Sequence, residues 1–320
     1  MRTAFIQELL RVAEEDDRVM LVVGDLGFGV VEPFAERFPL RFVNAGVAEQ
    51  NMTGMAAGMA LSGCVVFTYS IANFPTLRCL EQIRNDVCYH QANVKIISIG
   101  GGFSYGALGM THHATEDIAI MRALPNMTVI APGDPAEAAA ATRAVVNWPG
   151  PCYLRLGRAG EPMAHQSEID FQIGKAIQLR DGDDLTLIST GGLLPTAVAV
   201  ADRLAQQEVS TRVLSMHTIK PLDEEAVESA TRETRAMATL EEHSVIGGLG
   251  GAVAEVLAEL PSRGTPFTRI GLPSAFISRA GSSEYLREKA GLSIEAIVER
   301  LLKLLDKPQQ VGAGRRPAHS

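Results

Sequence analysis

The sequence predicts an α/β protein with two domains, each built on a mainly parallel sheet that carries helices on both faces. The chain has 320 residues, of which 46% are hydrophobic, and this is enough to fill two separate cores. Short, continuously apolar runs alternate with helical patterns along most of the chain. Strands of this kind, separated by crossover helices, favour parallel sheets that are buried on both sides.

The predicted elements form two series, separated by a glycine-containing segment of weak periodicity. We therefore predict a first domain at 1–165, a linker at 166–183, a second domain at 184–305 and a disordered tail at 306–320. In the first series, strands are predicted at 19–24, 64–69, 94–99, 128–131 and 152–156, and helices at 76–90, 115–124 and 134–147. In the second, strands are predicted at 185–190, 210–215, 236–240 and 267–270, and helices at 195–207, 223–234, 250–260 and 293–305.

The composition argues against several classes of protein. The net charge is −8 without a basic stripe, so no nucleic acid is expected as a partner. No apolar run of about 18 residues occurs, and the N-terminus lacks a signal-peptide core, so no membrane association is expected. The four cysteines have no CxxC spacing, which indicates reduced core residues of a cytoplasmic protein rather than disulfides or a zinc site.

The most informative segment is RFVNAGVAEQNMTGMAAGMA at 41–60. It predicts the end of a strand, a tight turn at Gly46 and a helix with Glu49 in its first turn. Small residues and methionines on every side of this helix indicate close packing all round. A lone acid here is most simply explained by the helix dipole, yet a carboxylate in a buried helix is costly unless something needs it.

The whole string resembles the Val-Gly-Ile-Ala-Glu-Gln segment of the transketolase family of thiamine-diphosphate enzymes. In that family the glutamate bonds N1′ of the cofactor's aminopyrimidine and so promotes loss of the C2 proton of the thiazolium. The resemblance implies that Glu49 is both a catalytic and a cofactor-binding residue. It also implies that the first domain is a thiamine-diphosphate-binding pyrimidine domain and the second a transketolase C-terminal domain.

Two further segments of the first domain fit the same family. The segment YSIANF at 69–74 corresponds to the loop beside the aminopyrimidine, which places Ile71 at the ring-stacking position and keeps Phe74 as a nearby aromatic. The segment IGGGFSYGALGMTHHATED at 99–117 carries the Gly-x-Thr-His element. Its histidine, here His112, faces the thiazolium and the substrate carbonyl in relatives, which implies catalytic and substrate-binding roles. His113 has no counterpart that can be assigned.

Two positions in this glycine-rich segment depart from the sugar-using relatives. Leu108 stands where they carry an aspartate that bonds a substrate hydroxyl, and Gly100 where transketolases of pentose and hexose phosphates carry a phosphate-contacting histidine. Loss of polar contacts changes specificity more readily than chemistry. We therefore expect a deoxygenated, branched or otherwise modified sugar as substrate.

Three arginines are candidate substrate ligands. Arg155 and Arg158 follow the last strand of the first domain, at the sheet edge where ligands bind in α/β proteins, although arginines are usually just solvated. Arg158 matches the family's substrate-phosphate arginine, and Arg2 matches another by its spacing to Asp25.

The magnesium motif of the family is missing. Gly24-Asp25-Leu26 followed by Asn51 lacks the second glycine and the asparagine pair, so Asp25 remains a candidate only for contact with the cofactor, and no metal ligand is assigned. The segments 219–223 and 240–251 resemble the C-terminal domain of the family. The chain therefore resembles the C-terminal section of a split transketolase, with a partner subunit that binds the diphosphate and Mg²⁺ in an α2β2 heterotetramer.

Other functions remain open at this point. An E1 β subunit of a 2-oxoacid dehydrogenase has a similar length and domain order, but usually carries a Thr-Pro-Ile-x-Glu motif. A deoxyxylulose-phosphate-synthase-like carboligase shares the same domains. A non-catalytic assembly subunit is the third alternative, and the presence of both Glu49 and His112 argues against it.

Overall fold

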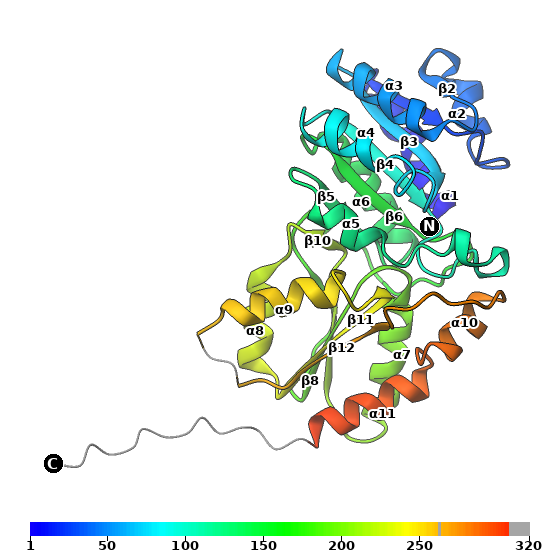
Figure 1. Cartoon of the computed structure of the whole chain (residues 1–320). Coiled ribbons are helices and arrows are strands. Elements are labelled where there is room, and N and C mark those ends of the chain that lie inside the picture. Colours follow the sequence, from blue (N-terminus) through cyan, green and yellow to red (C-terminus); the bar gives the residue numbers. More distant parts are fainter. Residues whose placement is uncertain (262–263, 307–320) are drawn as a thin grey trace.

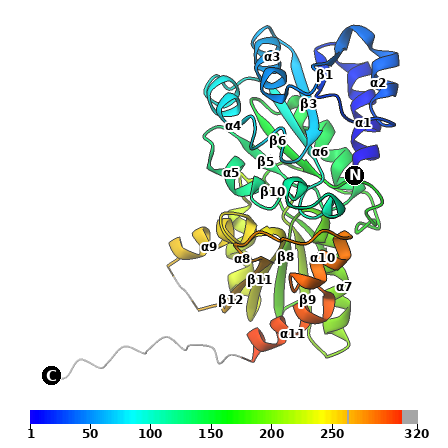
Figure 2. The same cartoon turned by 45° about the vertical axis from the view of Figure 1, so that its right-hand side comes forward.

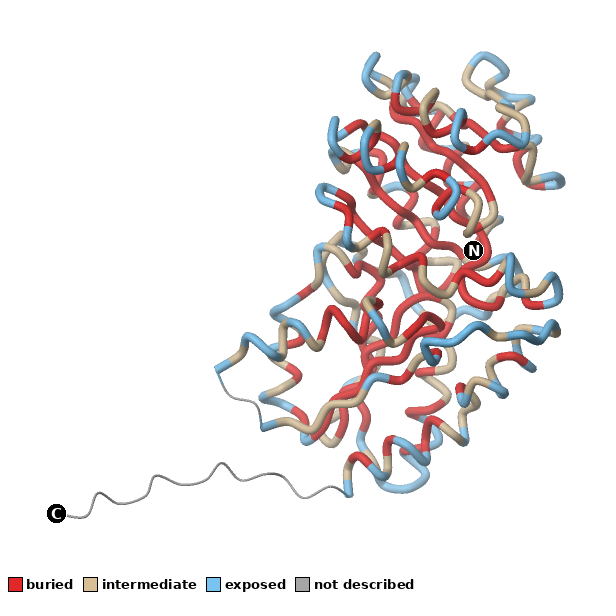
Figure 3. Tube along the Cα trace, in the orientation of Figure 1, coloured by how far each residue is buried: buried red, intermediate tan, exposed pale blue. Residues whose placement is uncertain are grey.

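The computed structural model describes residues 1–261 and 264–306 and contains two stacked α/β units (Figures 1 and 2). Apart from Asp306, the predicted tail lies outside the described residues. Both sheets are buried between layers of helices, and the exposed residues gather on the outer helix faces and the loops (Figure 3). Within residues 1–261 and 264–306, none of the helices could span a lipid bilayer.

The first sheet has seven strands in the order β10-β5-β6-β4-β3-β1-β2, and only β10 runs antiparallel. Parallel order brings the carboxyl ends of its other strands to one edge, where the site lies. Its strands are β1 (Val19–Val23), β2 (Phe42–Asn44), β3 (Val65–Ile71), β4 (Val94–Ile99), β5 (Thr128–Ile130), β6 (Cys152–Leu156) and β10 (Thr218–Lys220).

Helices cover both faces of this sheet and form two separate apolar clusters. One face carries α1 (Arg2–Glu15), α2 (Glu32–Arg37) and α6 (Pro135–Asn147), with the short η1 (Pro39–Arg41) beside α2. The other carries α3 (Glu49–Leu61), α4 (Leu80–Gln82), the π-helix η2 (Ile83–Cys88) and α5 (Asp117–Ala123). The start of α6 follows from local chemistry, because the Asp134 carboxylate accepts the Glu137 N–H and Pro135 takes the first helical position.

The second sheet has five strands in the order β12-β11-β8-β9-β7, and only β7 runs antiparallel. Its strands are β7 (Ile177–Arg180), β8 (Leu185–Ser189), β9 (Thr211–Ser215), β11 (Ala236–Ser244) and β12 (Phe267–Leu272). One face packs against α7 (Leu194–Ala205), α10 (Ser283–Lys289) and α11 (Ile294–Leu305), and the other against α8 (Glu224–Glu233) and α9 (Leu249–Glu259). The short helices η3 (Gly106–Leu108), η4 (Met110–His112) and η5 (Gly191–Leu193) lie in loops.

The predicted fold class is confirmed, and two strands lie where none was predicted. Strand β7 lies inside the segment predicted as a linker and pairs with β9 at the edge of the second sheet. Strand β10 comes from the second half of the chain, yet it pairs with β5 of the first sheet (Figure 1). Both are short antiparallel edge strands, and such strands carry little periodicity of their own.

Helix α3 also differs from its prediction. Met52, Thr53, Ala56 and Ala57 face the sheet and are buried, but Gly58 is exposed. A β-carbon added at Gly58 would meet nothing within 4 Å. The helix therefore packs closely on one side only within this chain, and its small residues leave the other side open.

Candidate active site

Glu49 lies at the first turn of α3 and is 1% exposed. Its Oε2 accepts a hydrogen bond of 2.7 Å from Nη1 of Arg78. Its Oε1 is buried and accepts no hydrogen bond from any described residue. Buried polar atoms in native proteins nearly always have a partner, so this oxygen can accept a hydrogen bond from a group outside the described residues.

Arg78 joins Glu49 to two other predicted residues. Its guanidinium carbon lies 4.6 Å from the centroid of the Phe74 ring. That ring and the His112 ring form a T-shaped pair, with the two centroids 5.3 Å apart. The three side chains predicted from separate segments therefore lie together. The sequence analysis missed Arg78, although a buried acid needs a cation, and Arg78 and Arg84 are the nearest that follow it.

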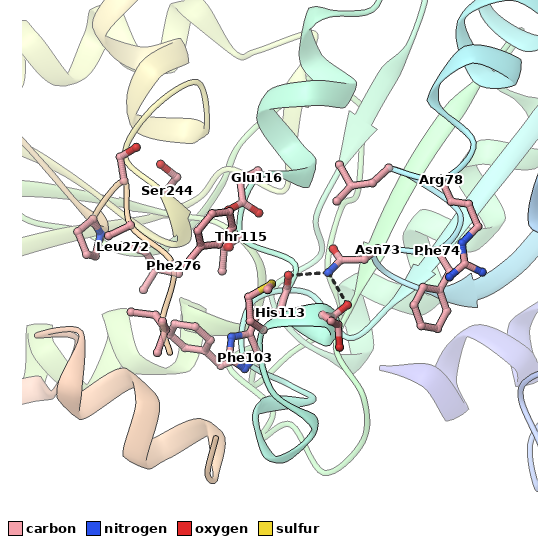
Figure 4. A pocket seen from close by; sticks show the side chains of 17 residues that line it. Asn73, Phe74, Arg78, Phe103, His113, Thr115, Glu116, Ser244, Leu272 and Phe276 are labelled. Atoms are coloured by element: carbon pink, nitrogen blue, oxygen red, sulfur yellow. Dashed lines mark hydrogen bonds between the residues drawn. The ribbon is translucent and has the colours of Figure 1, made fainter. Parts of the chain in front are cut away.

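Asn73 holds the segment that carries His112. Its amide nitrogen donates to the carbonyls of Thr111, at 3.0 Å, and His113, at 2.8 Å, so the two residues that flank His112 are fixed to the end of β3 (Figure 4). The His112 ring is half-buried, and its Nδ1 lies 3.0 Å from Oγ1 of Thr111. Sequence analysis gave Asn73 no role, because its partners are backbone atoms about 40 residues away.

His113 has a structural environment. Its ring is buried, its Nε2 lies 3.4 Å from the Gly106 carbonyl, and it meets the Phe103 ring edge-on at 5.2 Å. The adjacent histidines therefore differ: His112 packs against Phe74, and His113 packs against Phe103 and the Gly106 carbonyl.

The other two cofactor candidates lie at ends of neighbouring strands. Ile71 ends β3, opposite Ile99 of β4, and is half-buried. Asp25 follows β1 in a left-handed conformation, with φ of 55°. Its N–H donates to Oδ1 of Asn44, and its own Oδ1 accepts from the Asn44 amide at 3.0 Å. One of its carboxylate oxygens is therefore used to hold the end of β2.

Arg155, predicted as a substrate ligand, makes its contacts within the protein. Its Nε donates to Asp117 at 2.7 Å, and its Nη2 donates to the carbonyls of Ala114 and Glu242. Burial opposes the ionisation of Asp117, but the charge and hydrogen bond of Arg155 outweigh this and lower the pKa of that carboxyl. These contacts join the first domain to β11, and any substrate contact by Arg155 has to compete with them.

The other two arginines, Arg158 and Arg2, have different surroundings from those of Arg155. Arg158 is exposed, and its guanidinium lies over the ring of Tyr105, 5.1 Å from the centroid. Arg2 begins α1 beside Tyr69, and its Nε is buried without a hydrogen-bond partner among the described residues. Burial raises the pKa of the Tyr69 phenol, and the Arg2 guanidinium opposes that rise. Arg158 is therefore accessible to an anion from solution, whereas the unpaired Nε of Arg2 is buried.

The structure explains one departure from the sugar-using relatives. Gly100 has φ of +94°, and a β-carbon there would lie 2.2 Å from the Tyr105 ring. The ring of Tyr105 thus fills the space of a side chain at position 100, and its centroid lies 6.4 Å from that of His112. Leu108 is 57% exposed in η3, so the described residues leave more than half of it uncovered.

A cavity of about 460 Å³ opens beside Phe74 and Arg78; His113 is among the residues that line it, whereas Glu49 and His112 are not. Figure 4 shows side chains of both domains around it, with Phe74 and Arg78 on one side and Leu272 and Phe276 on the other. The open Glu49 oxygen and the aromatic Phe74 fit the pyrimidine end of thiamine diphosphate, which needs a carboxylate and an apolar contact. Among residues 1–261 and 264–306, no group of three His, Cys, Asp or Glu side chains could hold a metal ion.

Comparison with known proteins identifies both domains. Residues 1–161 match the family model of the transketolase pyrimidine-binding domain, a class of domain for which thiamine diphosphate is the implied cofactor. Residues 174–297 match the model of the transketolase C-terminal domain. The chain belongs to the transketolase family, as the segments around Glu49 and His112 predict.

Similar proteins span the same two domains. An apulose-4-phosphate transketolase subunit from Phocaeicola vulgatus is 39% identical over 308 residues, which cover 96% of this chain and 97% of the relative. A 6-deoxy-6-sulfo-D-fructose transketolase subunit from a Clostridium species is 39% identical and covers 93% of this chain and 92% of the relative. A solved split-gene transketolase, described as an inactive β4 tetramer, is 37% identical with a TM-score of 0.86, covering 95% of this chain and 97% of its own.

Proposed function

We propose that the chain is the C-terminal subunit of a split, thiamine-diphosphate-dependent transketolase-like enzyme. The enzyme transfers a two-carbon ketol unit between sugar or sugar-phosphate substrates in the cytoplasm. The observation that carries the proposal is the buried Glu49 carboxylate, with one oxygen bound by Arg78 and the other open. Subunits named for this activity that span the same two domains support it.

Each residue of the site has a task in this proposal. Bound thiamine diphosphate would supply a nucleophilic thiazolium carbon that takes up the two-carbon unit. Glu49 holds a proton at N1′ through its open oxygen, while Arg78 fixes the other oxygen. Phe74 and Ile71 pack against the aminopyrimidine, and Asp25 lies near its binding side. His112 donates a hydrogen bond to the substrate oxygen on which negative charge develops.

The partner completes the site in this proposal. Magnesium takes hard oxygen ligands and binds the diphosphate of the cofactor, and this chain lacks the corresponding motif. A separate N-terminal-section subunit therefore supplies the Mg²⁺ and diphosphate site, and two copies of each subunit form an α2β2 heterotetramer. The open side of α3, with Gly58 exposed, is a surface on which another subunit can pack closely.

The substrate is proposed to differ from the pentose and hexose phosphates. Tyr105 occupies the space of a side chain at Gly100, and Leu108 offers no polar group. A substrate hydroxyl without a partner would cost about 1–3 kcal/mol. Arg158 and Arg2 are the proposed anion contacts, with Arg155 as a third candidate. Two relatives named for apulose 4-phosphate and for 6-deoxy-6-sulfo-D-fructose support a modified sugar.

The experiment is reconstitution of the two subunits. The chain is purified alone and together with its proposed partner, and cofactor binding is measured calorimetrically with thiamine diphosphate and Mg²⁺. We expect weak or no binding by the chain alone, and stoichiometric binding with ketol transfer by the complex. Tight binding by the chain alone would contradict the split-subunit proposal.

The assay panel separates the alternatives. It contains modified sugars, xylulose 5-phosphate with ribose 5-phosphate, and 2-oxoacids with a lipoyl acceptor. Turnover of 2-oxoacids alone would indicate an E1 β subunit, and a complex without any cofactor-dependent turnover would indicate an assembly subunit. Highest efficiency on xylulose 5-phosphate with ribose 5-phosphate would contradict the modified-sugar proposal.

A further inference from the structure

The second domain binds the loop that carries His112. This glycine-rich loop, residues 100–113, belongs to the first domain by sequence, but its Phe103 is fully buried in the core of the second. The ring belongs to the same apolar cluster as residues of β8, β11 and α10, namely Leu187, Leu240 and Leu286. A phenylalanine buried in this way ties the loop to the second domain through its side chain.

The backbone of Phe103 is bound by the second domain as well. Its N–H donates to Oε1 of Glu242 at 3.0 Å, and its carbonyl accepts from the Ser283 hydroxyl at 2.8 Å. Glu242 is itself buried in β11, and its Oε2 accepts from Nη2 of Arg287 at 2.6 Å. The second domain therefore satisfies both the N–H and the carbonyl of Phe103. Arg287 in turn orients Glu242, the acid that accepts from the N–H.

Glycines allow this close approach. A β-carbon at Gly102 would lie 2.5 Å from Cδ of Glu242, and one at Gly106 would lie 2.6 Å from Leu286 and 2.7 Å from the Gly281 carbonyl. Gly281 also donates its N–H to the Gly106 carbonyl at 3.2 Å. The loop backbone thus contacts the second domain at successive positions, which only glycine permits without rearrangement.

These contacts reach His112 through the loop itself. Gly102 and Ala114 exchange two backbone hydrogen bonds, of 2.8 and 3.0 Å, that close the base of the loop. Asn73 fixes the carbonyls on either side of His112 from the first domain. The loop is therefore held at one end by Asn73 and at the other by the second domain.

We propose that Glu242, supported by Arg287 and Ser283, is a positioning residue: it sets the loop so that His112 faces the cofactor side. The second domain then contributes to the chemistry through the loop as well as to assembly. This proposal rests on the proposed function for the role of His112, and the attachment of the loop can be tested without activity.

The experiment compares Glu242→Ala, Glu242→Gln and Ser283→Ala with Glu288→Gln as a matched control, because Glu288 is an exposed acid on the same helix as Arg287. Hydrogen–deuterium exchange of the full chain is followed in peptides that cover the glycine-rich loop. We expect Glu242→Ala to speed exchange of the Phe103 amide about tenfold or more, because its acceptor is lost. Glu242→Gln keeps an oxygen acceptor and should restore most of the protection, and Ser283→Ala should have a smaller effect than Glu242→Ala.

The same variants are then assayed in the assembled complex. Glu242→Ala should lower kcat by about tenfold or more while the Kd for thiamine diphosphate stays within about twofold, and the control should match the wild type. Unchanged loop exchange in Glu242→Ala would overturn the proposal, and so would an equal loss of kcat and cofactor affinity. A wild-type complex without ketol transfer would overturn the proposed function, and the exchange result would then still decide whether Glu242 holds the loop.

Discussion

The two sheets carry glutamates at comparable places and use them differently. Glu49 starts α3 on the first sheet, and Glu241 accepts hydrogen bonds from the N–H groups of Leu249 and Gly250 at the start of α9 on the second. Both side chains are buried. Glu241 has both oxygens bound by the protein, whereas Glu49 has one oxygen without a partner among the described residues.

The difference shows which acid is available to a ligand. A buried acceptor without a hydrogen bond costs free energy, and the cost is recovered when a ligand supplies the donor. Glu241 has no such vacancy, and desolvation raises the pKa of its carboxyl to about 7. Burial of an acid at a helix N-terminus is therefore common to both domains. Asp117, at the start of α5, also leaves one buried carboxylate oxygen without a partner among the described residues, so Glu49 is distinguished by its open oxygen together with the neighbouring Phe74 and His112.

The largest expected effect is that of Glu49→Gln on the assembled enzyme. The amide cannot hold a proton at N1′ as the acid does, so turnover should fall by about 10²–10⁴-fold, the usual contribution of acid–base catalysis. Exchange of the C2 proton of thiamine diphosphate, followed by NMR, should slow by a similar factor while the fold stays intact. Exchange at the wild-type rate would show that Glu49 is not the activating acid.

His112→Ala should affect the chemistry more than the binding of the cofactor. The imidazole lies beside Phe74, and its proposed task is to bond the substrate oxygen, so kcat should fall by about 10²-fold. Steady-state kinetics together with calorimetry of thiamine diphosphate separate the two effects, and His113→Ala should mainly lower the melting temperature, because His113 packs against Phe103. An unchanged kcat with much weaker cofactor binding would place His112 on the diphosphate side instead.

The second glutamate of the comparison, Glu241, should make the stability of the fold depend on pH. Its pKa rises from 4.5 to about 7 on folding, so the folded state binds the proton more tightly than the unfolded state. This contribution to the free energy of unfolding is complete below about pH 4.5 and is lost as the pH rises towards about 7, by at most about 1.4 kcal/mol per pH unit. In Glu241→Gln that slope should disappear.

Denaturant unfolding of the wild type and the variant at several pH values between about 5 and 7 measures the effect. The difference in the free energy of unfolding between the two proteins should change in favour of the variant as the pH rises. A constant difference across this range would mean that Glu241 does not titrate there.

The smallest expected effect concerns the two sides of α3. Gly58→Ala adds a methyl group in open space within a helix, so the free energy of unfolding of the chain alone should increase by about 0.5–1 kcal/mol. If a partner packs on that side, the same change should weaken assembly, which sedimentation of the two-subunit mixture would measure. Unchanged assembly would place the partner elsewhere.

Several residues of the candidate site could be predicted from the sequence because they stand in local motifs. Glu49, Phe74 and His112 stand in recognisable strings, and the strands of the sheet interiors, such as β4 and β6, are marked by continuous apolar runs. Arg78 and Asn73 were missed because their roles depend on which distant groups the fold brings next to them. The open side of α3 was missed because small residues show that close packing is possible and do not show which neighbour provides it.

The position of β10 also bears on how the chain folds as it is synthesised. Without β10 the first sheet would end at β5. Strand β10 pairs with that edge, and its Thr218 lies 88 residues after its partner Ile130 in the chain. Until this segment leaves the ribosome, the nascent first domain presents the unpaired backbone of β5, which is a template for wrong pairing. A fragment ending near residue 165 would keep that edge permanently exposed. The two domains therefore have separate cores, but they cannot be completed independently. The second half of the chain must leave the ribosome before β10 can complete the first sheet.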